Sequence, residues 1–459
     1  MSTRDVMIGL EMHITLPTKS KLFCSCPATH DAEPNTNICP ICMGLPGSKP
    51  SLNKDALLKA VLIAKALGCK INEQIYFSRK VYFYPDLPKN YQITQFEVPI
   101  GYDGCLALFS SNKKIGIRRV HLEEDPASIK YTKSGNVLVD YNRSGIPLVE
   151  VVTEPHINSS LQAREFLNLL TANLQYLGIL SEKGHLAMKT DVNISIRGYE
   201  RVEIKNISGI YDIEKAIEYE IKRQLKKIKY GIRIERETLR FDDKRKITIP
   251  VRRKEFEEDY GYIFEPDLPV FHTNHEMVKL PELPAEKVER LSKLYNVPLA
   301  EVAELVLFSK PLTEFFENIA KELGFSAKIF SFVKNTLPSI LRENKAHSDV
   351  VFKYYKELKT ILSKLARGEI TGNVAKNAIA ELIKTGKLVE IKSVSKDLSK
   401  VRERILEYLN ENEKIVEEFE KNPKVINYII GQIMKEFKGK YSPADIHKIA
   451  LEVLRKKLR

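Results

Sequence analysis

Four cysteines near the start of the chain have the spacing of a metal-binding site. They form two close pairs, Cys24/Cys26 and Cys39/Cys42, separated by a stretch rich in proline and asparagine. Thiolate sulfur is a preferred ligand of Zn²⁺, and two close pairs joined by a loop suit tetrahedral coordination. Four protein ligands leave no open position, so we expect a structural zinc. The alternative is four unrelated thiols in a reducing compartment.

An alternating segment near the N-terminus places an acid and a histidine side by side. In residues 8–16 every second residue is apolar, and the intervening residues include Glu11 and His13. A period of two indicates a β-strand with one buried and one polar face.

Two later segments, 189–197 and 201–205, repeat this alternation. Their polar positions include Asp191 in the first segment and Glu203 and Lys205 in the second. One interpretation is an antiparallel sheet whose polar side simply meets solvent. The other is that acids, a histidine and a lysine from several strands share one functional face.

Further carboxylates occur in two other places, and one of them is expensive to bury. Glu150 lies inside the otherwise β-branched run 149–152, and three acids follow a histidine in His121-Leu122-Glu123-Glu124-Asp125. An embedded acid requires a partner or a cation. Mg²⁺ takes oxygen ligands and accompanies substrate phosphates, so a magnesium site is one interpretation. A strand position beside a lysine or arginine is the other.

The composition is that of a globular protein with several domains. The chain has 459 residues and a net charge of +13, with 43% hydrophobic and 29% charged residues. It contains no apolar run of the roughly 18 residues that a membrane span needs, and no signal-peptide pattern. The small number of cysteines argues against a disulfide scaffold, so we expect a cytoplasmic protein with no membrane contact.

The sequence lacks the common nucleotide-binding and nucleophile motifs. We find no phosphate-binding loop, no dinucleotide-binding glycine pattern and no nucleophile elbow. The basic run 222–229 is compatible with a polyanionic partner but supports nucleic-acid binding only weakly.

The pattern of the chain changes after residue 284. Residues 1–284 are rich in short alternating runs and turns, whereas the later part has helical periodicity throughout. We therefore expect an α+β fold, in which a β-rich cradle domain with an antiparallel sheet and a zinc loop precedes all-α domains. The expected domains are a catalytic, zinc-containing cradle at 1–284, a helical domain at 285–396 and a helical tail at 397–459.

Several longer motifs occur in a fixed order along the chain. They are the opening strand 8–13, the paired cysteines ending in Gly44-Leu45-Pro46-Gly47, and the signatures at 82–93 (YFYPDLPKNYQI), 121–125 (HLEED), 139–145 (VDYNRSG), 191–195 (DVNIS), 265–269 (EPDLP) and 431–435 (GQIMK). Together they resemble the B-subunit family of tRNA-dependent amidotransferases, the Asp-tRNA(Asn)/Glu-tRNA(Gln) type. The resemblance extends over most of the first domain and reaches the tail.

The resemblance implies a ligase reaction in two steps, shared among several proteins of one complex. This chain would use ATP and Mg²⁺ to phosphorylate the side-chain carboxylate of Asp or Glu mischarged on tRNA. Ammonia from a partner amidase would then displace the phosphate. The implied partners are the amidase (the A subunit) and a small protein (the C subunit), in a heterotrimer, and the mischarged tRNA, which the tail would contact.

The resemblance also implies roles for particular residues. The implied magnesium ligands are Glu11, His13, Glu124 and Glu150, the implied catalytic residues are Asp191, Lys205 and Glu124, and the implied zinc ligands are Cys24, Cys26, Cys39 and Cys42. The residues that contact ATP are not identified.

A second function remains open at this point. The chain would then be a non-enzymatic, RNA-binding scaffold with a zinc-stapled β domain and basic helices. In that case the embedded acids would be ordinary residues of a solvated sheet face. An amidase activity of its own is disfavoured because the nucleophile motifs are absent.

Overall fold

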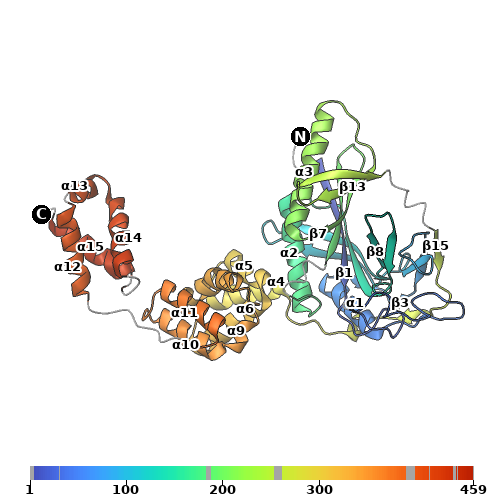
Figure 1. Cartoon of the computed structure of the whole chain (residues 1–459), viewed down its shortest axis with the longest axis horizontal. Helices are drawn as coiled ribbons and strands as arrows, with labels where there is room; N and C mark the ends of the chain where they lie inside the picture. Colours follow the sequence, from blue (N-terminus) through green and yellow to red (C-terminus); the bar gives the residue numbers. More distant parts are fainter. Residues whose placement is uncertain are drawn as a thin grey trace. The chain divides into compact units, whose positions relative to one another are not determined.

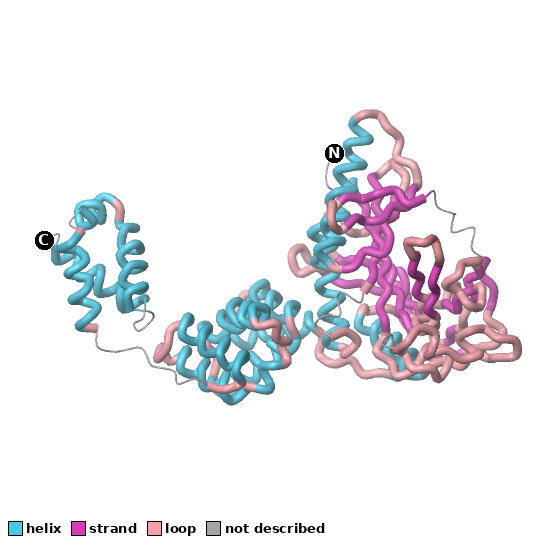
Figure 2. The backbone as a smooth tube through the Cα atoms, viewed as in Figure 1, coloured by secondary structure: helices cyan, strands magenta, loops and turns pink. Residues whose placement is uncertain are grey.

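The computed structural model describes residues 5–29, 32–181, 188–252, 261–388, 398–412, 414–437, 441 and 443–457. The chain divides into two compact units, Met1–Phe308 and Ser309–Arg459 (Figures 1 and 2). Among the described helices, none combines the length and the apolar character needed to cross a membrane.

The first unit contains all the described strands and five α-helices. The strands are β1 (Val6–Thr15), β2 (Lys70–Ile71), β3 (Gln74–Ile75), β4 (Ser78–Val81), β5 (Tyr91–Thr94), β6 (Gly101–Ala107), β7 (Lys114–Glu124), β8 (Ser128–Tyr131), β9 (Val137–Asp140), β10 (Pro147–Thr153), β11 (Lys189–Ile196), β12 (Val202–Ser208), β13 (Glu237–Asp242), β14 (Ile247–Arg252), β15 (Gly261–Phe264) and β16 (Phe271–His272). The helices are α1 (Lys54–Ala66), α2 (Ser160–Tyr176), α3 (Ile210–Lys229), α4 (Pro284–Tyr295) and α5 (Leu299–Phe308), with a 3₁₀ turn at His275–Met277.

One large sheet organises this unit. Its nine described strands run in the order β14-β13-β12-β11-β1-β10-β7-β6-β2. Every neighbouring pair is antiparallel except β12 and β13, which are parallel. The parallel pair arises because α3 connects these two strands, and a helical crossover returns the chain in the same direction.

The apolar side of β1 anchors the hydrophobic core. Ile8, Leu10, Met12 and Ile14 are fully buried and belong to one cluster with apolar residues of α1, α2 and α3. Figure 1 shows α2 and α3 along one side of the sheet, with β8 and β15 on the other side. The polar residues of β1 therefore point away from the helices, toward the smaller strands.

The described strands of this unit also form three small sheets. One has the order β15-β4-β5, and the other two pair β16 with β3 and β8 with β9. Glu265, which follows β15, is fully buried and accepts two hydrogen bonds of 2.8 Å from the guanidinium of Arg79 on β4. This bidentate ion pair fixes the end of β15 against β4.

The second unit is helical throughout its described residues. Its helices are α6 (Lys310–Leu323), α7 (Ala327–Ser331), α8 (Leu337–Glu343), α9 (Val350–Lys353), α10 (Tyr355–Ala366), α11 (Gly372–Thr385), α12 (Ser399–Glu411), α13 (Lys414–Lys421), α14 (Ile426–Phe437) and α15 (Pro443–Lys457), with a π-helical turn at Phe332–Thr336 and a 3₁₀ turn at Pro423–Val425. Helices α12, α14 and α15 share a hydrophobic cluster of their own.

The expected α+β class is confirmed, with an antiparallel-rich sheet followed by a helical region. The expected limit between the helical and tail domains, at residues 396 and 397, lies outside the described residues.

The core position of β1 leads to a stability prediction. Leu10→Ala removes a fully buried side chain at the centre of the sheet, and we expect a loss of about 2–5 kcal/mol in the free energy of unfolding. Leu138→Ala is the matched control, because Leu138 is 57% exposed and its truncation should cost under about 1 kcal/mol. Urea unfolding followed by circular dichroism measures both changes, and equal losses would contradict the assigned core.

Candidate functional site

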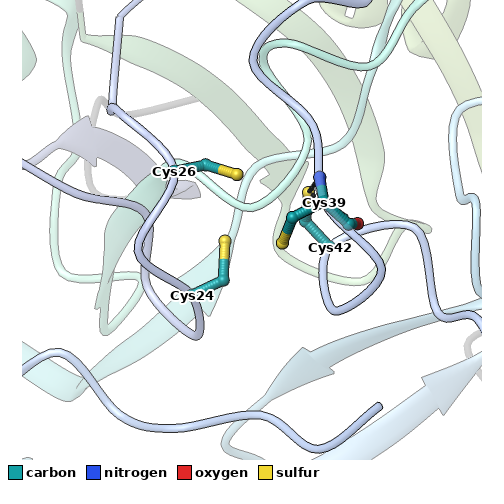
Figure 3. A group of neighbouring side chains, drawn as sticks. All are labelled: Cys24, Cys26, Cys39 and Cys42. Atoms are coloured by element: carbon teal, nitrogen blue, oxygen red, sulfur yellow. Dashed lines mark hydrogen bonds between the residues drawn. The ribbon is translucent and has the colours of Figure 1, made fainter. Parts of the chain in front are cut away.

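The four paired cysteines converge on one point. The sulfur atoms of Cys24, Cys26, Cys39 and Cys42 all lie within 4.8 Å of one another, and Figure 3 shows them facing a common centre from two loop segments. A set of four thiols at such separations fits the tetrahedral coordination of Zn²⁺. Because the set supplies all four ligands, a bound zinc would be structural.

A buried lysine lies against this cysteine cluster. The ammonium of Lys21 is fully buried, lies 3.7 Å from Cys42 Sγ, and donates to the backbone carbonyls of Asn37 and Tyr141 at 2.8 and 3.3 Å. The hydrogen bond from Cys24 lowers the pKa of Cys42 to about 4, and the charge of Lys21 contributes to this shift. The positive charge therefore favours thiolates at the metal position. No motif indicated this role for Lys21.

The polar face of the sheet is organised by strand register. One row runs across four strands, with Lys189 opposite His13, His13 opposite Glu150 and Glu150 opposite His121. In the adjacent row, Glu11 is paired with Asp191 on one side. Because residues two apart on a strand share a face, both rows point to the same side.

The first row contains a compact group that is able to hold a cation. His13 Nε2 lies 3.6 Å from Glu123 and 3.9 Å from Glu150, and His121 Nε2 lies 3.0 Å from Glu150. The ligand atoms of His13, Glu123 and Glu150 all lie within 4.8 Å of one another. The carboxylate oxygens of this set suit a hard divalent cation such as Mg²⁺, whereas the imidazole nitrogen is a ligand more typical of transition metals.

The charged groups within this row shift one another's pKa values. Burial alone would raise the pKa of Glu150, but the adjacent His121 outweighs burial and lowers it well below its usual range. Burial alone would lower the pKa of His13, but Glu123 and Glu150 reverse the effect and raise it. Near neutral pH the carboxylate of Glu150 is therefore ionised.

A second acidic group adjoins the first and contains a lysine. Carboxylate oxygens of Glu11, Asp191 and Glu203 lie within 4.8 Å of one another. Lys205 Nζ lies 3.0 Å from Asp191 and 2.9 Å from Glu203. Burial opposes the charge of Lys205, but these two acids raise its pKa. Burial, together with the neighbouring carboxylates, raises the pKa of Glu11.

Glu124 lies apart from both acidic groups. Its carboxylate accepts hydrogen bonds from Lys89 Nζ at 2.6 and 2.7 Å and from the backbone of Ile93 at 2.8 Å. Glu124 lines a small cavity beside the zinc loop together with Lys21. Successive residues of a strand point to opposite faces, so Glu123 faces His13 while Glu124 faces away.

The structure thus brings together most, but not all, of the residues implied by the sequence motifs. Glu11, His13, Glu150, Asp191 and Lys205 line one hollow of about 360 Å³. Glu123 joins them in that hollow, and Glu124 does not. The sequence contains the information that distinguishes these two acids. Glu123 is two residues from His121, just as Glu11 is two residues from His13, and residues two apart on a strand share a face.

Comparisons with known proteins cover nearly the whole chain. The family described as "GatB/GatE catalytic domain" matches residues 6–279, and the family described as "GatB domain" matches residues 314–457. A relative from Saccharolobus solfataricus is 41% identical over 99% of both chains. Relatives from Sulfolobus acidocaldarius and Thermodesulfovibrio yellowstonii are 39% and 38% identical over at least 97% of each chain. All three are named as the B subunit of aspartyl/glutamyl-tRNA(Asn/Gln) amidotransferase.

The cysteine cluster leads to a prediction about metal content. We expect about one zinc per chain in freshly purified, reduced protein, and Cys24→Ser should lose most of it because a tetrahedral site needs all four ligands. Cys105→Ser is the control, since Cys105 is exposed and outside the cluster. Elemental analysis measures the zinc. Wild-type protein without zinc, or Cys24→Ser protein with a full complement, would refute the assignment.

Proposed function

Because the chain belongs to the GatB/GatE family and is the B subunit of a tRNA-dependent amidotransferase, we propose that it performs the activation step of amidation. A carboxylate oxygen of Asp or Glu, mischarged on tRNA, attacks the γ-phosphorus of ATP, and ADP leaves. Ammonia then attacks the acyl carbon of the mixed anhydride. The bond from the acyl carbon to the phosphate oxygen breaks, the leaving phosphate takes up the proton that the nitrogen loses, and the side-chain amide remains on the tRNA.

The single observation that supports this proposal most strongly is the row of His13, Glu150 and His121 across the sheet. Phosphoryl transfer requires alignment and charge neutralisation more than a covalent nucleophile. The residues His13, Glu123 and Glu150 would hold Mg²⁺, with Glu11 beside them. Bound Mg²⁺ would neutralise phosphate charge and orient the transferred group. The carboxylate oxygens of Glu123 and Glu150 fit this ion, which is usually held by one or two carboxylates together with substrate phosphates.

Lys205 and Asp191 form the second part of the proposed site. Lys205 supplies a fixed positive charge at the hollow, where it would attract the negative oxygens of the transferring phosphoryl group. Asp191 accepts hydrogen bonds from Lys205 at 3.0 Å and from the backbone of Asn206 at 2.7 Å, so it holds the lysine in place. We assign Asp191 as a positioning residue and Lys205 as a catalytic residue.

We propose a supporting role for Glu124 in place of a metal-binding one. It is the last residue of β7 and binds Lys89 and Ile93, while the next residue back, Glu123, faces His13. The buried Lys89–Glu124 pair therefore restrains the strand end from which Glu123 reaches the metal group. Removing only one member would leave an uncompensated buried charge, which is strongly destabilising.

The likeness of the chain to B subunits of a multi-subunit amidotransferase supports the proposed partners. A separate amidase, the A subunit, would release ammonia from glutamine, and a small C subunit would complete a heterotrimer. Mischarged Asp-tRNA(Asn), Glu-tRNA(Gln) or both would be substrates.

The activation step is tested by Glu150→Gln in the reconstituted complex. The substitution keeps the side-chain volume and removes the charge, so ATP-dependent activation should fall by roughly 100-fold or more. Phosphate release and amidated tRNA are measured separately, with ATP, glutamine and mischarged tRNA supplied. Binding of tRNA and glutamine hydrolysis should change little.

Glu154→Gln is the matched control for this experiment. Glu154 lies just after the same strand, forms an ion pair of 2.9 Å with Arg118, and does not line the hollow. Activation at the wild-type rate by Glu150→Gln would disprove the metal assignment. Intact ATP turnover with loss of amidation alone would place Glu150 in ammonia delivery.

We further propose that the tail, residues 397–459, contacts tRNA. The last turn of α15 carries Arg455, Lys456 and Lys457, and Lys/Arg contacts to phosphate release counterions on binding. Deleting the tail should weaken tRNA binding and flatten its dependence on salt. Affinities measured at two salt concentrations test this, and unchanged values would mean that the tail serves another purpose, such as contact with a partner protein.

A further inference from the structure

Two stacked aromatic rings line the hollow that contains the acidic groups. Phe96, which follows β5, and Tyr262 of β15 have ring centroids 4.0 Å apart and ring planes 16° from parallel. Both line the same hollow as His13 and Glu150, and Phe96 is 45% exposed. Within the described residues, neither ring belongs to the hydrophobic core cluster of this unit. Core packing therefore does not account for the pair.

The residue before Phe96 is hydrogen-bonded to β7, the strand that carries His121 and Glu123. The side chain of Gln95 accepts a hydrogen bond of 2.9 Å from the backbone of Leu122, the residue between His121 and Glu123. On the other side of Phe96, Glu97 accepts a hydrogen bond of 2.6 Å from Ser78 of β4. The ring is thus anchored through both of its chain neighbours.

Tyr262 is held in place by the three-stranded sheet β15-β4-β5. Tyr262 lies opposite Lys80 in the pairing of β15 with β4. Three residues further on, the fully buried Glu265 is held by Arg79 of β4. The two rings are therefore pre-organised, which reduces the entropy that a ligand must lose on binding them.

A cationic group with an unused donor lies in the same hollow. The Nε atom of Arg119 is buried and has no hydrogen-bond partner within the described part of the chain. Arg119 is paired across the strands with Val152, two residues from Glu150, so it lies on the same face as the metal group. A guanidinium is well suited to phosphate oxygens. The hollow thus offers an aromatic face, a phosphate-binding donor and a group that is able to bind a cation.

We propose that the Phe96–Tyr262 pair is the platform on which an adenine ring stacks in this hollow. Aromatic side chains bind nucleobases through their faces, and the exposed ring of Phe96 offers such a face. The inference rests on the proposed function, in which two substrates carry adenine: ATP, and the 3′-terminal adenosine of the tRNA. The chemistry of stacking is the same for both, so the experiment must separate them.

The test uses Phe96→Leu in the reconstituted complex. Leucine keeps an apolar side chain and removes the aromatic face, so affinity for the stacked ligand should fall roughly 10- to 100-fold. Phe96→Tyr should restore it, because the aromatic face returns. Phe109→Leu is the matched control, since Phe109 is 37% exposed and lies in the β6–β7 turn, outside the hollow.

Two binding arms identify the source of the adenine. Titration calorimetry with a non-hydrolysable ATP analogue and Mg²⁺ reports on the nucleotide, and inorganic tripolyphosphate serves as the probe without a base. Loss of analogue affinity with unchanged tripolyphosphate affinity assigns the platform to ATP. The second arm compares uncharged tRNA that ends in the 3′-terminal adenosine with uncharged tRNA lacking that adenosine, so that the two ligands differ only in this nucleotide. If Phe96→Leu abolishes the difference in affinity between these two tRNAs, the platform binds the terminal adenosine of the tRNA.

Other outcomes overturn the inference. Unchanged affinities in both arms, with wild-type thermal stability, would show that the rings bind no adenine. Equal weakening of analogue and tripolyphosphate would show a general distortion of the hollow. The binding arms do not depend on turnover, so a complex that binds through Phe96 but forms no activated product would disprove the proposed function and leave this inference standing.

Discussion

The pairing of β1 with β10 and β11 is the constraint on which the site depends. It sets His13 opposite Glu150 and Glu11 opposite Asp191, while the other face of β1 is buried against the helices. A slip of one residue would turn the acids into the core and the apolar residues into the hollow. The free-energy cost of exposing the apolar residues and burying the acids therefore keeps the acids in position. Core packing and site geometry are two results of the same register.

Charge balance is the second condition that this face must meet. Several carboxylates lie within a few ångströms of one another, and at neutral pH their mutual repulsion opposes folding. Lys205 offsets Asp191 and Glu203, and His121 offsets Glu150. Carboxylates that are clustered but only partly neutralised lower the stability of the fold, so this group is unusual for a surface that binds nothing. It is an arrangement expected where a cation and phosphates bind, and such ionisable clusters gather at functional sites.

The end of β7 lies between the acidic hollow and the cysteine cluster. Glu123 faces the acidic hollow, and Glu124, on the opposite side, binds Lys89 in the cavity beside the zinc loop. The buried Lys21 extends this side to the cysteine cluster through its contacts with Cys42 and Asn37. The zinc loop is thus packed against the back of the strand that carries part of the site. A metal bound by the four cysteines would therefore stabilise the loop that packs against this strand.

The sequence by itself determined the fold class, the family and the close approach of the four cysteines, because alternation, helical periodicity and ligand spacing are local properties of the chain. It also predicted that Glu11 and His13 share a polar face. Only the tertiary structure decided which distant acids join them, since strand order and register depend on packing between segments far apart in sequence. That is why Glu123 and not Glu124 meets His13, and why no local pattern indicated the contact of Lys21 with Cys42 or the stacking of Phe96 on Tyr262.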